Sequence, residues 1–323
     1  MKLSVIVPGF NTPDRWWTRC LKSVLEALPA DAEILCVDDG SRDRPSIQIS
    51  DARIKWVFLP ENQGLARARN AALAIAEGEF VTFIDSDDEI YGETFRRCLH
   101  ELQETGTDIA IYGVRCVWPE DGLMKDDGLT HAPTLVDGRI GPRDVLWLHR
   151  QNLLNYSCNK VYRRSFLVQA NLSFMPEGMP YEDIIFNLGC LRAGARYCYV
   201  DYIGYVYYRT RGTLLSRYKS TLCPGAGAAS EAWTRYKEET PGAWECLGNL
   251  GEVSQSQLQN RAWRNCWMPG SPVSLGDRWK MRPGLAFFKM ACFVLLRRYA
   301  YFRFVRRWNT CRNYPHARNW REE

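Results

Sequence analysis

The stretch GLARARNAALAIAEGEFVTFIDSDD, residues 64–88, decides the fold. Its first part is rich in alanine and predicts a helix that is closed by Gly78. The second part is an apolar run from Glu79 that predicts a buried strand ending in three aspartates, Asp85, Asp87 and Asp88. A helix followed directly by a buried strand is typical of a parallel sheet covered by helices.

The same alternation extends to both sides of this stretch. Strands are predicted over residues 2–10, 32–41, 54–60 and 108–118, and helices over 14–28 and 91–105. After a loop over 119–141 the pattern is less regular, with a helix over 143–154, a mixed segment over 158–174, a helix over 181–195, a strand or hairpin over 196–209 and a linker over 221–230. The order predicts an α/β fold with helices on both faces of a parallel sheet.

The composition is that of a folded protein, with 323 residues, 46% hydrophobic and 24% charged. The twelve cysteines form no CxxC pair and the four histidines do not cluster, so we expect no zinc site. Scattered single cysteines fit a reducing compartment. We expect no signal peptide, because the apolar run near the start is short and ends at Pro8. The longest apolar run, residues 285–296, is too short to span a bilayer.

The charge is unevenly distributed. Residues 278–323 contain twelve Lys and Arg against two Asp and Glu, a net +10 in a chain whose formal charge is +5. Large apolar side chains alternate with arginines between residues 285 and 308, which is typical of a helix lying in a membrane interface near anionic headgroups. The alternative is a basic C-terminal helix that packs on the protein itself or is simply solvated.

Asp85 and Asp87 stand on alternate positions as the chain leaves the strand, so their carboxylates can converge on one point. A divalent cation of the magnesium or manganese kind would cancel their repulsion and could bridge to phosphate. The alternative is structural, since Asp87 or Asp88 could cap the helix that follows.

Asp38 and Asp39 lie at the end of the second predicted strand, which closes with the turn sequence Asp-Asp-Gly-Ser. Parallel sheets bind ligands beyond the carboxyl ends of their strands, so these carboxylates could lie close to Asp85 and accept hydrogen bonds from a base or a ribose. The alternative is an Asx-type turn, for which Asp-Gly-Ser is well suited and which this motif alone favours.

Two further motifs carry charges that suit a diphosphate and a proton transfer. NQGLARARN, residues 62–70, places Arg67 and Arg69 in the first turns of a helix, where cations and backbone N–H groups could approach a diphosphate, although both arginines could instead face water. Glu182 and Asp183 stand at a predicted helix start, where the helix dipole favours carboxylates, and one of them could act as a general base.

Taken together and in this order, the motifs resemble the family-two glycosyltransferases, enzymes with the GT-A fold. The matching segments are SVIVPGFN, VDDGS, NQGLARARN and FIDSDD, while NKVYRRSF, YEDIIFN and GYVYYRTR resemble the bacterial branch that builds surface polysaccharides and lipopolysaccharide. The resemblance covers about residues 3–215.

The resemblance implies a role for each matching residue. Asp183 matches the catalytic base, and Asp85 and Asp87 match the DxD element, with Asp87 on the metal and Asp85 on the ribose or metal. Asp39 would hold the uracil with Asp38 beside it. The remaining residues expected at the nucleotide pocket are Pro8, Phe10, Asn11 and Arg69.

The implied protein is a metal-dependent, inverting glycosyltransferase that moves one sugar from a nucleotide-diphosphate donor, expected to be a UDP-sugar. The acceptor would be a hydroxyl of a glycan or lipid-linked molecule in surface-polysaccharide biosynthesis. The QxxRW element of processive synthases is absent, which favours addition of a single sugar. The alternatives are a GT-A-like protein that binds a nucleotide sugar or glycan without turnover, and an aspartate-nucleophile phosphatase, which the Asp88-Glu89 sequence disfavours.

The domain organisation follows from these motifs. Residues 1–220 form the expected GT-A domain, with a nucleotide-binding half over 1–118 and an acceptor half over 119–220, and residues 221–323 form a helical, basic C-terminal region. We expect a cytoplasmic protein with peripheral membrane contact through residues 278–323 at the inner face of the plasma membrane, and no nucleic-acid partner. Donor sugar, acceptor and oligomeric state are not specified by these motifs.

Overall fold

The computed structural model describes residues 3–119, 122–127, 135–136, 139–140, 148, 153–154, 156–175 and 182–209, all within one compact unit. Most of the loop expected over 119–141 and of the helix expected over 143–154 lies outside these residues. The linker expected over 221–230 and the whole C-terminal region over 221–323, with its basic tail, also lie outside them.

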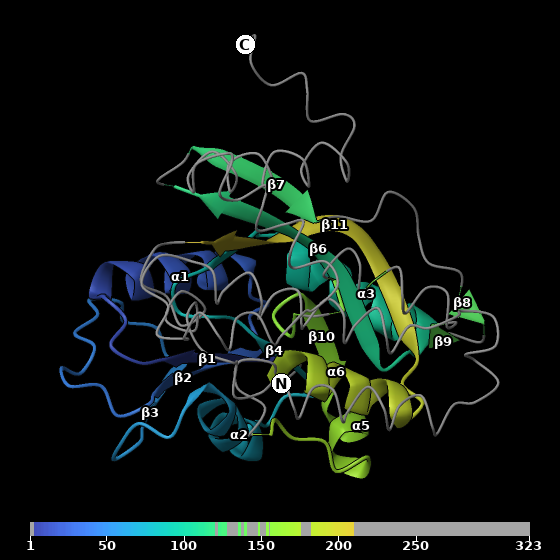
Figure 1. Ribbon diagram of the computed structural model, residues 1–323, viewed down its shortest axis with the longest axis horizontal. Helices are drawn as coiled ribbons and strands as arrows, with labels where there is room; N and C mark the ends of the chain where they lie inside the picture. Colours follow the sequence, from blue (N-terminus) through green and yellow to red (C-terminus); the bar gives the residue numbers. More distant parts are fainter. Residues whose placement is uncertain are drawn as a thin grey trace, which may run out of the picture. The chain divides into compact units, whose positions relative to one another are not determined.

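A nine-stranded sheet forms the centre of the described fold (Figure 1). Its order is β3 (Ile54–Phe58), β2 (Ala32–Asp38), β1 (Leu3–Gly9), β4 (Phe80–Phe83), β10 (Lys160–Arg163), β6 (Ile109–Trp118), β11 (Tyr197–Tyr208) and β5 (Glu89–Ile90). The ninth strand, β7 (Leu123–Asp127), pairs with β6, and β8 (Leu135–Val136) pairs separately with β9 (Arg139–Ile140). Strands β1 and β2 are almost completely buried, which explains why they are continuous apolar runs.

The sheet is mostly, but not entirely, parallel. Strands β3, β2, β1 and β4 run parallel, and β6 runs parallel to β11. Strand β10 lies antiparallel between β4 and β6, and β5 lies antiparallel to β11. The alternating pattern of the first hundred residues thus predicted the parallel strands correctly, while β10 came from the segment over 158–174 that gave only a mixed signal.

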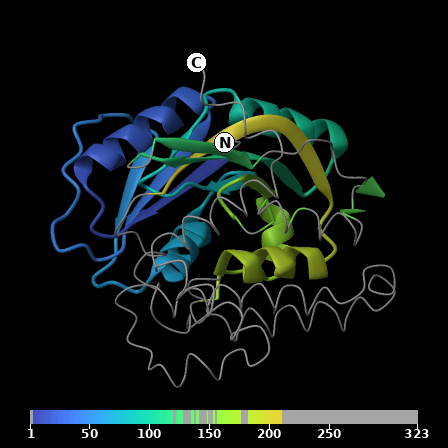
Figure 2. The same cartoon turned by 45° about the horizontal axis from the view of Figure 1, so that its top comes forward.

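Helices cover both faces of the sheet, as expected from the sequence. Helices α1 (Asp14–Ala27) and α3 (Thr94–Thr105) lie on one face, and α2 (Leu65–Ile75), α5 (Arg164–Gln169) and α6 (Glu182–Arg192) lie on the other (Figures 1 and 2). Helix α1 buries Trp17, Cys20, Leu21 and Val24, which recur at helical spacing.

Three predicted boundaries are corrected by the structure. The helix predicted from residue 91 begins at Thr94, because the N–H of Tyr91 donates to the carbonyl of Gly204 at 2.9 Å and so continues the pairing of β5 with β11. The strand predicted over 32–41, with turn residues at its end, has its last strand residue at Asp38. The segment over 196–209 is one strand, with irregular pairing to β6 between Val200 and Tyr205, and not a hairpin.

The loops that carry the sequence motifs lie at one edge of the sheet. Strand β1 pairs with both β2 and β4, so the carboxyl ends of these three strands are neighbours. The N–H of Asp39 donates to the carbonyl of Gly9 at 2.9 Å. Gly40 has φ +67°, and a Cβ there would lie 2.3 Å from the carbonyl carbon of Glu61, so only glycine lets the loops after β2 and β3 come this close.

Candidate active site

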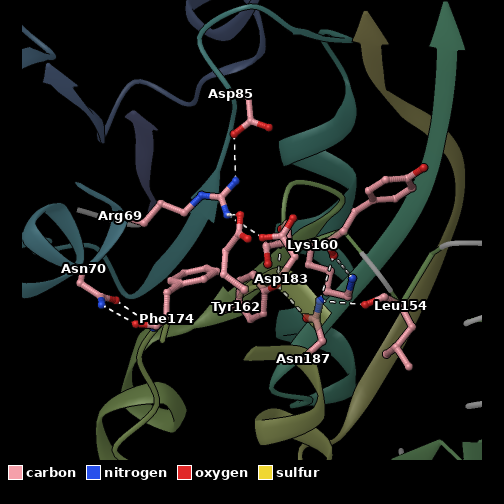
Figure 3. Close-up of polar contacts among 12 residues, drawn as sticks. Arg69, Asn70, Asp85, Leu154, Lys160, Tyr162, Phe174, Asp183 and Asn187 are labelled. Atoms are coloured by element: carbon pink, nitrogen blue, oxygen red, sulfur yellow. Dashed lines mark hydrogen bonds and ion pairs between the residues drawn. The ribbon is translucent and has the colours of Figure 1, made fainter. Parts of the chain in front are cut away.

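Arg69 connects the aspartates at the end of β4 to those at the start of α6 (Figure 3). Its side chain is 1% exposed. Nη2 donates to Asp85 Oδ1 at 2.9 Å, and Nη1 donates to Asp183 Oδ1 at 2.5 Å. Glu182 Oε1 lies 3.7 Å from Nη1. One guanidinium therefore brings together carboxylates that are almost a hundred residues apart in the sequence.

The electrostatics of this cluster follow from its burial. Burial alone would lower the pKa of the Arg69 guanidinium, but the charges of Asp183, Asp85 and Glu182 outweigh it and raise that pKa. Burial and the neighbouring Asp183 raise the pKa of Glu182 despite the nearby guanidinium. The interpretation of solvent-facing arginines is correct for Arg67, which is exposed, and wrong for Arg69.

A buried tyrosine holds the loop that carries Asp85 and Asp87. The Tyr205 hydroxyl accepts the N–H of Asp85 at 3.1 Å and donates to Asp88 Oδ2 at 2.8 Å. The N–H of Tyr208 donates to Asp88 Oδ1 at 2.8 Å. The helix-cap alternative is therefore wrong, because α3 begins only at Thr94 and Asp88 instead fastens the loop to β11.

The Asp87 side chain differs from its two neighbours in its contacts. Its carboxylate is repelled most strongly by Asp85, accepts its own backbone N–H and is attracted by Arg19. Burial, and then repulsion by Asp85, raise the pKa of Asp87 to about 6. Asp85 keeps one oxygen free of the Arg69 contact. A pair of partly buried carboxylates with unused oxygens fits a hard divalent cation, with Asp87 and Asp85 as ligands.

The described residues contain no group of three or more His, Cys, Asp or Glu side chains arranged to hold a metal ion. Magnesium commonly completes its coordination with substrate phosphates and water. The metal site stays a prediction.

Asp38 and Asp39 have different surroundings. The Asp39 carboxylate accepts from Asn62 Nδ2 at 3.0 Å and from the N–H groups of Gln63 and Gly64 at 2.9 and 2.8 Å. It thereby fixes the loop that leads into α2 and Arg69. The Asp38 side chain is buried, and its Oδ1 has no hydrogen-bond partner within the described residues. A ligand that donates an N–H or O–H would satisfy this oxygen.

The loop after β1 contributes the other residues expected at the nucleotide pocket. Pro8 is buried within β1, and Phe10 is 41% exposed. Asn11 has φ +50°, accepts the N–H of Arg42 through Oδ1 at 3.0 Å and donates its own N–H to Ser41 Oγ at 2.7 Å. These contacts join the loops after β1 and β2. Within the described part of the chain, no hydrogen bond or ion pair joins the side chains of Asp38 or Asp39 to those of Asp85, Asp87 or Asp183.

A buried polar network lies between β10 and the middle of α6 (Figure 3). Lys160 Nζ donates to the carbonyls of Leu153 and Tyr156 and to Asn159 Oδ1. Asn187 Nδ2 donates to the carbonyl of Leu154 at 2.8 Å, and the Tyr162 hydroxyl donates to Asn187 Oδ1 at 3.2 Å. This network fixes α6, and with it Asp183, against β10.

Comparison with known proteins identifies the family. The model of the glycosyl transferase family 2 matches residues 4–169, half of the chain. The chain belongs to glycosyl transferase family 2. The uncharacterized glycosyltransferase EpsJ of Bacillus subtilis is 30% identical over 287 residues, covering 84% of this chain and 80% of that protein. The succinoglycan biosynthesis protein ExoO of Rhizobium meliloti is 27% identical over 240 residues, covering 72% and 68%.

Solved structures show the same fold. Residues 1–349 of TarS from Staphylococcus aureus, in complex with UDP-GlcNAc, match with a TM-score of 0.59 and 22% identity over 90% of this chain and 81% of that one. The expected GT-A glycosyltransferase fold is thus confirmed. The described residues of this family-2 chain include no helix that is long and apolar enough to cross a membrane.

The Tyr205 contacts predict a stability effect. Replacing Tyr205 with Phe removes the hydroxyl, which leaves the Asp85 N–H and the buried Asp88 Oδ2 each without this partner. We expect a loss of about 1–3 kcal/mol in the free energy of unfolding, measured by urea denaturation. Tyr202→Phe on the same strand is the control, because that ring is partly exposed beside Arg97. Equal effects of the two substitutions would contradict the role of Tyr205.

The raised pKa of Asp87 predicts a second effect, a change of folding stability with pH. Its carboxyl group ionises near pH 6 in the folded protein and near pH 4 in the unfolded chain, so the stability it contributes falls as the pH rises through this window. Asp87→Asn should therefore be more stable than wild type by about 1–3 kcal/mol at pH 7.5 without metal. The difference should shrink towards pH 4 in thermal melts. A gain that is independent of pH, or a loss at pH 7.5, would contradict the pKa shift of Asp87.

Proposed function

We propose that the protein is an inverting glycosyltransferase that moves one sugar from a UDP-sugar to a hydroxyl of a glycan or lipid-linked acceptor. The observation that supports this most is the contact of Arg69 with both Asp85 and Asp183, which joins the DxD element to the expected base. The TarS complex with UDP-GlcNAc supports a UDP-sugar donor, and the relative named for succinoglycan biosynthesis supports a role in surface-polysaccharide biosynthesis.

In the proposed reaction the acceptor hydroxyl attacks the anomeric carbon of the donor. The new bond forms between that oxygen and the anomeric carbon while the bond from the carbon to the β-phosphate oxygen breaks. The proton passes to Asp183, whose Oδ1 is held by Arg69, so that Oδ2 is available to accept it. The electron pair leaves with UDP, and one displacement inverts the anomeric configuration.

The donor would be held by groups at the sheet edge. Asp85 and Asp87 would bind a divalent cation, which supplies electrostatic stabilisation of the diphosphate leaving group. We further propose that Asp38 takes the N–H or O–H donor of the nucleoside, since its Oδ1 is free within the described residues. Asp39, the residue first expected there, has both carboxylate oxygens engaged with residues 62–64.

Arg69 has a different role in this proposal from the one the sequence suggested. Because its side chain is buried and bound to protein carboxylates, it neutralises the acidic cluster and does not contact the diphosphate directly. The guanidinium lies between Asp85 and Asp183, so its positive charge offsets the repulsion between the two carboxylates.

The test is a donor panel with a matched carboxylate control. The protein is incubated with several UDP-sugars and manganese, and UDP release is measured with and without a chelator. We expect one donor to be preferred, turnover to require the metal, and the product to have inverted configuration by NMR. Asp183→Asn should lower turnover by about 10²–10⁴-fold while leaving UDP affinity unchanged. Asp201→Asn, an exposed carboxylate on β11, should change neither.

Three results would contradict the proposal. Binding of UDP-sugars without turnover would indicate the non-catalytic alternative. Wild-type turnover by Asp183→Asn would exclude Asp183 as the base. Retention of configuration in the product would exclude the single displacement.

We also propose that residues 278–323 make peripheral contact with an anionic membrane, which supports a lipid-linked acceptor and a place at the inner face of the plasma membrane. The support is the charge and apolar pattern of the sequence alone. The full-length protein should float with vesicles that contain anionic phospholipid. Replacing Arg297, Arg298, Arg303, Arg306 and Arg307 with glutamine should abolish flotation, and equal flotation of both proteins would overturn the proposal.

A further inference from the structure

Phe174 contacts all three elements that carry the charged groups of the site. The Arg69 guanidinium of α2 lies over its ring, 5.1 Å from the centroid. Phe83, the last residue of β4, meets the ring edge-on at 5.0 Å, two residues before Asp85. Phe186 of α6 stacks on it at 4.1 Å with an interplanar angle of 10°, three residues after Asp183. The ring therefore fixes the spacing between the cation and both carboxylates.

The backbone of Phe174 is in turn held by Asn70 (Figure 3). Asn70 Nδ2 donates to the carbonyl of Phe174 at 2.8 Å, and the N–H of Phe174 donates to Asn70 Oδ1 at 2.9 Å. Residues 172–175 belong to no helix or strand, so a side-chain amide satisfies backbone groups that would otherwise lack a regular partner. Asn70 directly follows Arg69. One turn of α2 therefore supplies both the guanidinium that lies over the Phe174 ring and the amide that holds the Phe174 backbone.

Arg69 needs such a support because its hydrogen bonds do not fix it completely. Its Nε is buried and has no hydrogen-bond partner within the described residues. The two Nη atoms bind the carboxylates, while the aromatic face of Phe174 limits the tilt of the guanidinium plane. A long arginine side chain has many rotamers, and a planar guanidinium is well suited to packing on an aromatic ring.

We propose that Asn70 and Phe174 are positioning residues for sugar transfer, which hold the Arg69 guanidinium where it bridges Asp85 and Asp183. This inference rests on the proposed function, because Asp183 must be the base for its orientation to affect the rate. Loss of the Phe174 ring, or of the two hydrogen bonds from Asn70, lets Arg69 tilt. Asp183 then no longer presents its free oxygen to the acceptor. The donor contacts at Asp38 and Asp87 are unaffected. Small displacements of catalytic groups have large effects on rate.

The experiment uses the full-length protein and two variants that act through different atoms. Phe174→Leu keeps an apolar side chain and removes the aromatic face, while Asn70→Ala removes both hydrogen bonds and keeps a residue that favours helix. The matched control is Phe80→Leu. Phe80, in β4, is likewise a fully buried phenylalanine and lies against an arginine, Arg163, at 4.8 Å. Among the described residues, its ring has no stacking or cation–π contact with Arg69, Phe174 or Phe186. Wild type and Asp183→Asn are assayed alongside.

We expect Phe174→Leu and Asn70→Ala to lower kcat by about 10–100-fold and to change the donor KM by less than about three-fold. Phe80→Leu should lower thermal stability while kcat and the donor KM remain as in wild type. Phe174→Tyr, which retains the aromatic face, should recover most of the activity.

Two outcomes would overturn the inference while leaving the proposed function intact. One is wild-type kcat in both variants, with Asp183→Asn inactive. The other is the same fall in kcat in Phe80→Leu as in Phe174→Leu, which would show that any loss of core packing has this effect. If wild type transfers no sugar, or if Asp183→Asn is fully active, the proposed function itself fails.

Discussion

The buried guanidinium of Arg69 is the constraint on which the rest of the site depends. A charge removed from water is tolerated only where opposite charges and hydrogen bonds replace the solvent, and the partners here are Asp85 and Asp183. These residues come from the end of β4 and the start of α6, so α2, β4 and α6 must pack together before the charge of Arg69 is compensated. The fold and this cluster of charged side chains therefore form together.

The carboxylates that Arg69 does not reach have other functions. Asp88 is fully buried and is satisfied by Tyr205 and Tyr208, so it holds the loop in place. Asp87 lies in the same loop, where burial, and then repulsion by Asp85, raise its pKa to about 6. A bound cation would offset this unfavourable negative charge. Under the proposed function, the stability lost at Asp87 in the ligand-free protein would favour binding of a metal and a diphosphate.

The sequence predicted the parts that depend on local pattern. The buried strands β1, β2 and β4 are continuous apolar runs, and the placement of motifs after them follows from the geometry of parallel strands. The sequence did not predict what depends on long-range packing. Nothing near Asp88 indicates its pairing with Tyr205, and nothing near Phe174 indicates its stacking on Phe186. The sequence also did not indicate the burial of Arg69, because Arg67, two residues earlier, has the same local sequence pattern and is exposed.

The central claim is that Arg69 compensates Asp85 and Asp183 together, and unfolding free energies of neutralised variants test it most directly. Arg69→Met alone leaves two carboxylates without their cation and should lose about 3–5 kcal/mol in chemical denaturation. Adding Asp85→Asn and Asp183→Asn to that variant removes the uncompensated charges, so the triple variant should recover most of the loss. If the three substitutions instead destabilise additively, the carboxylates do not depend on Arg69 and the account is wrong.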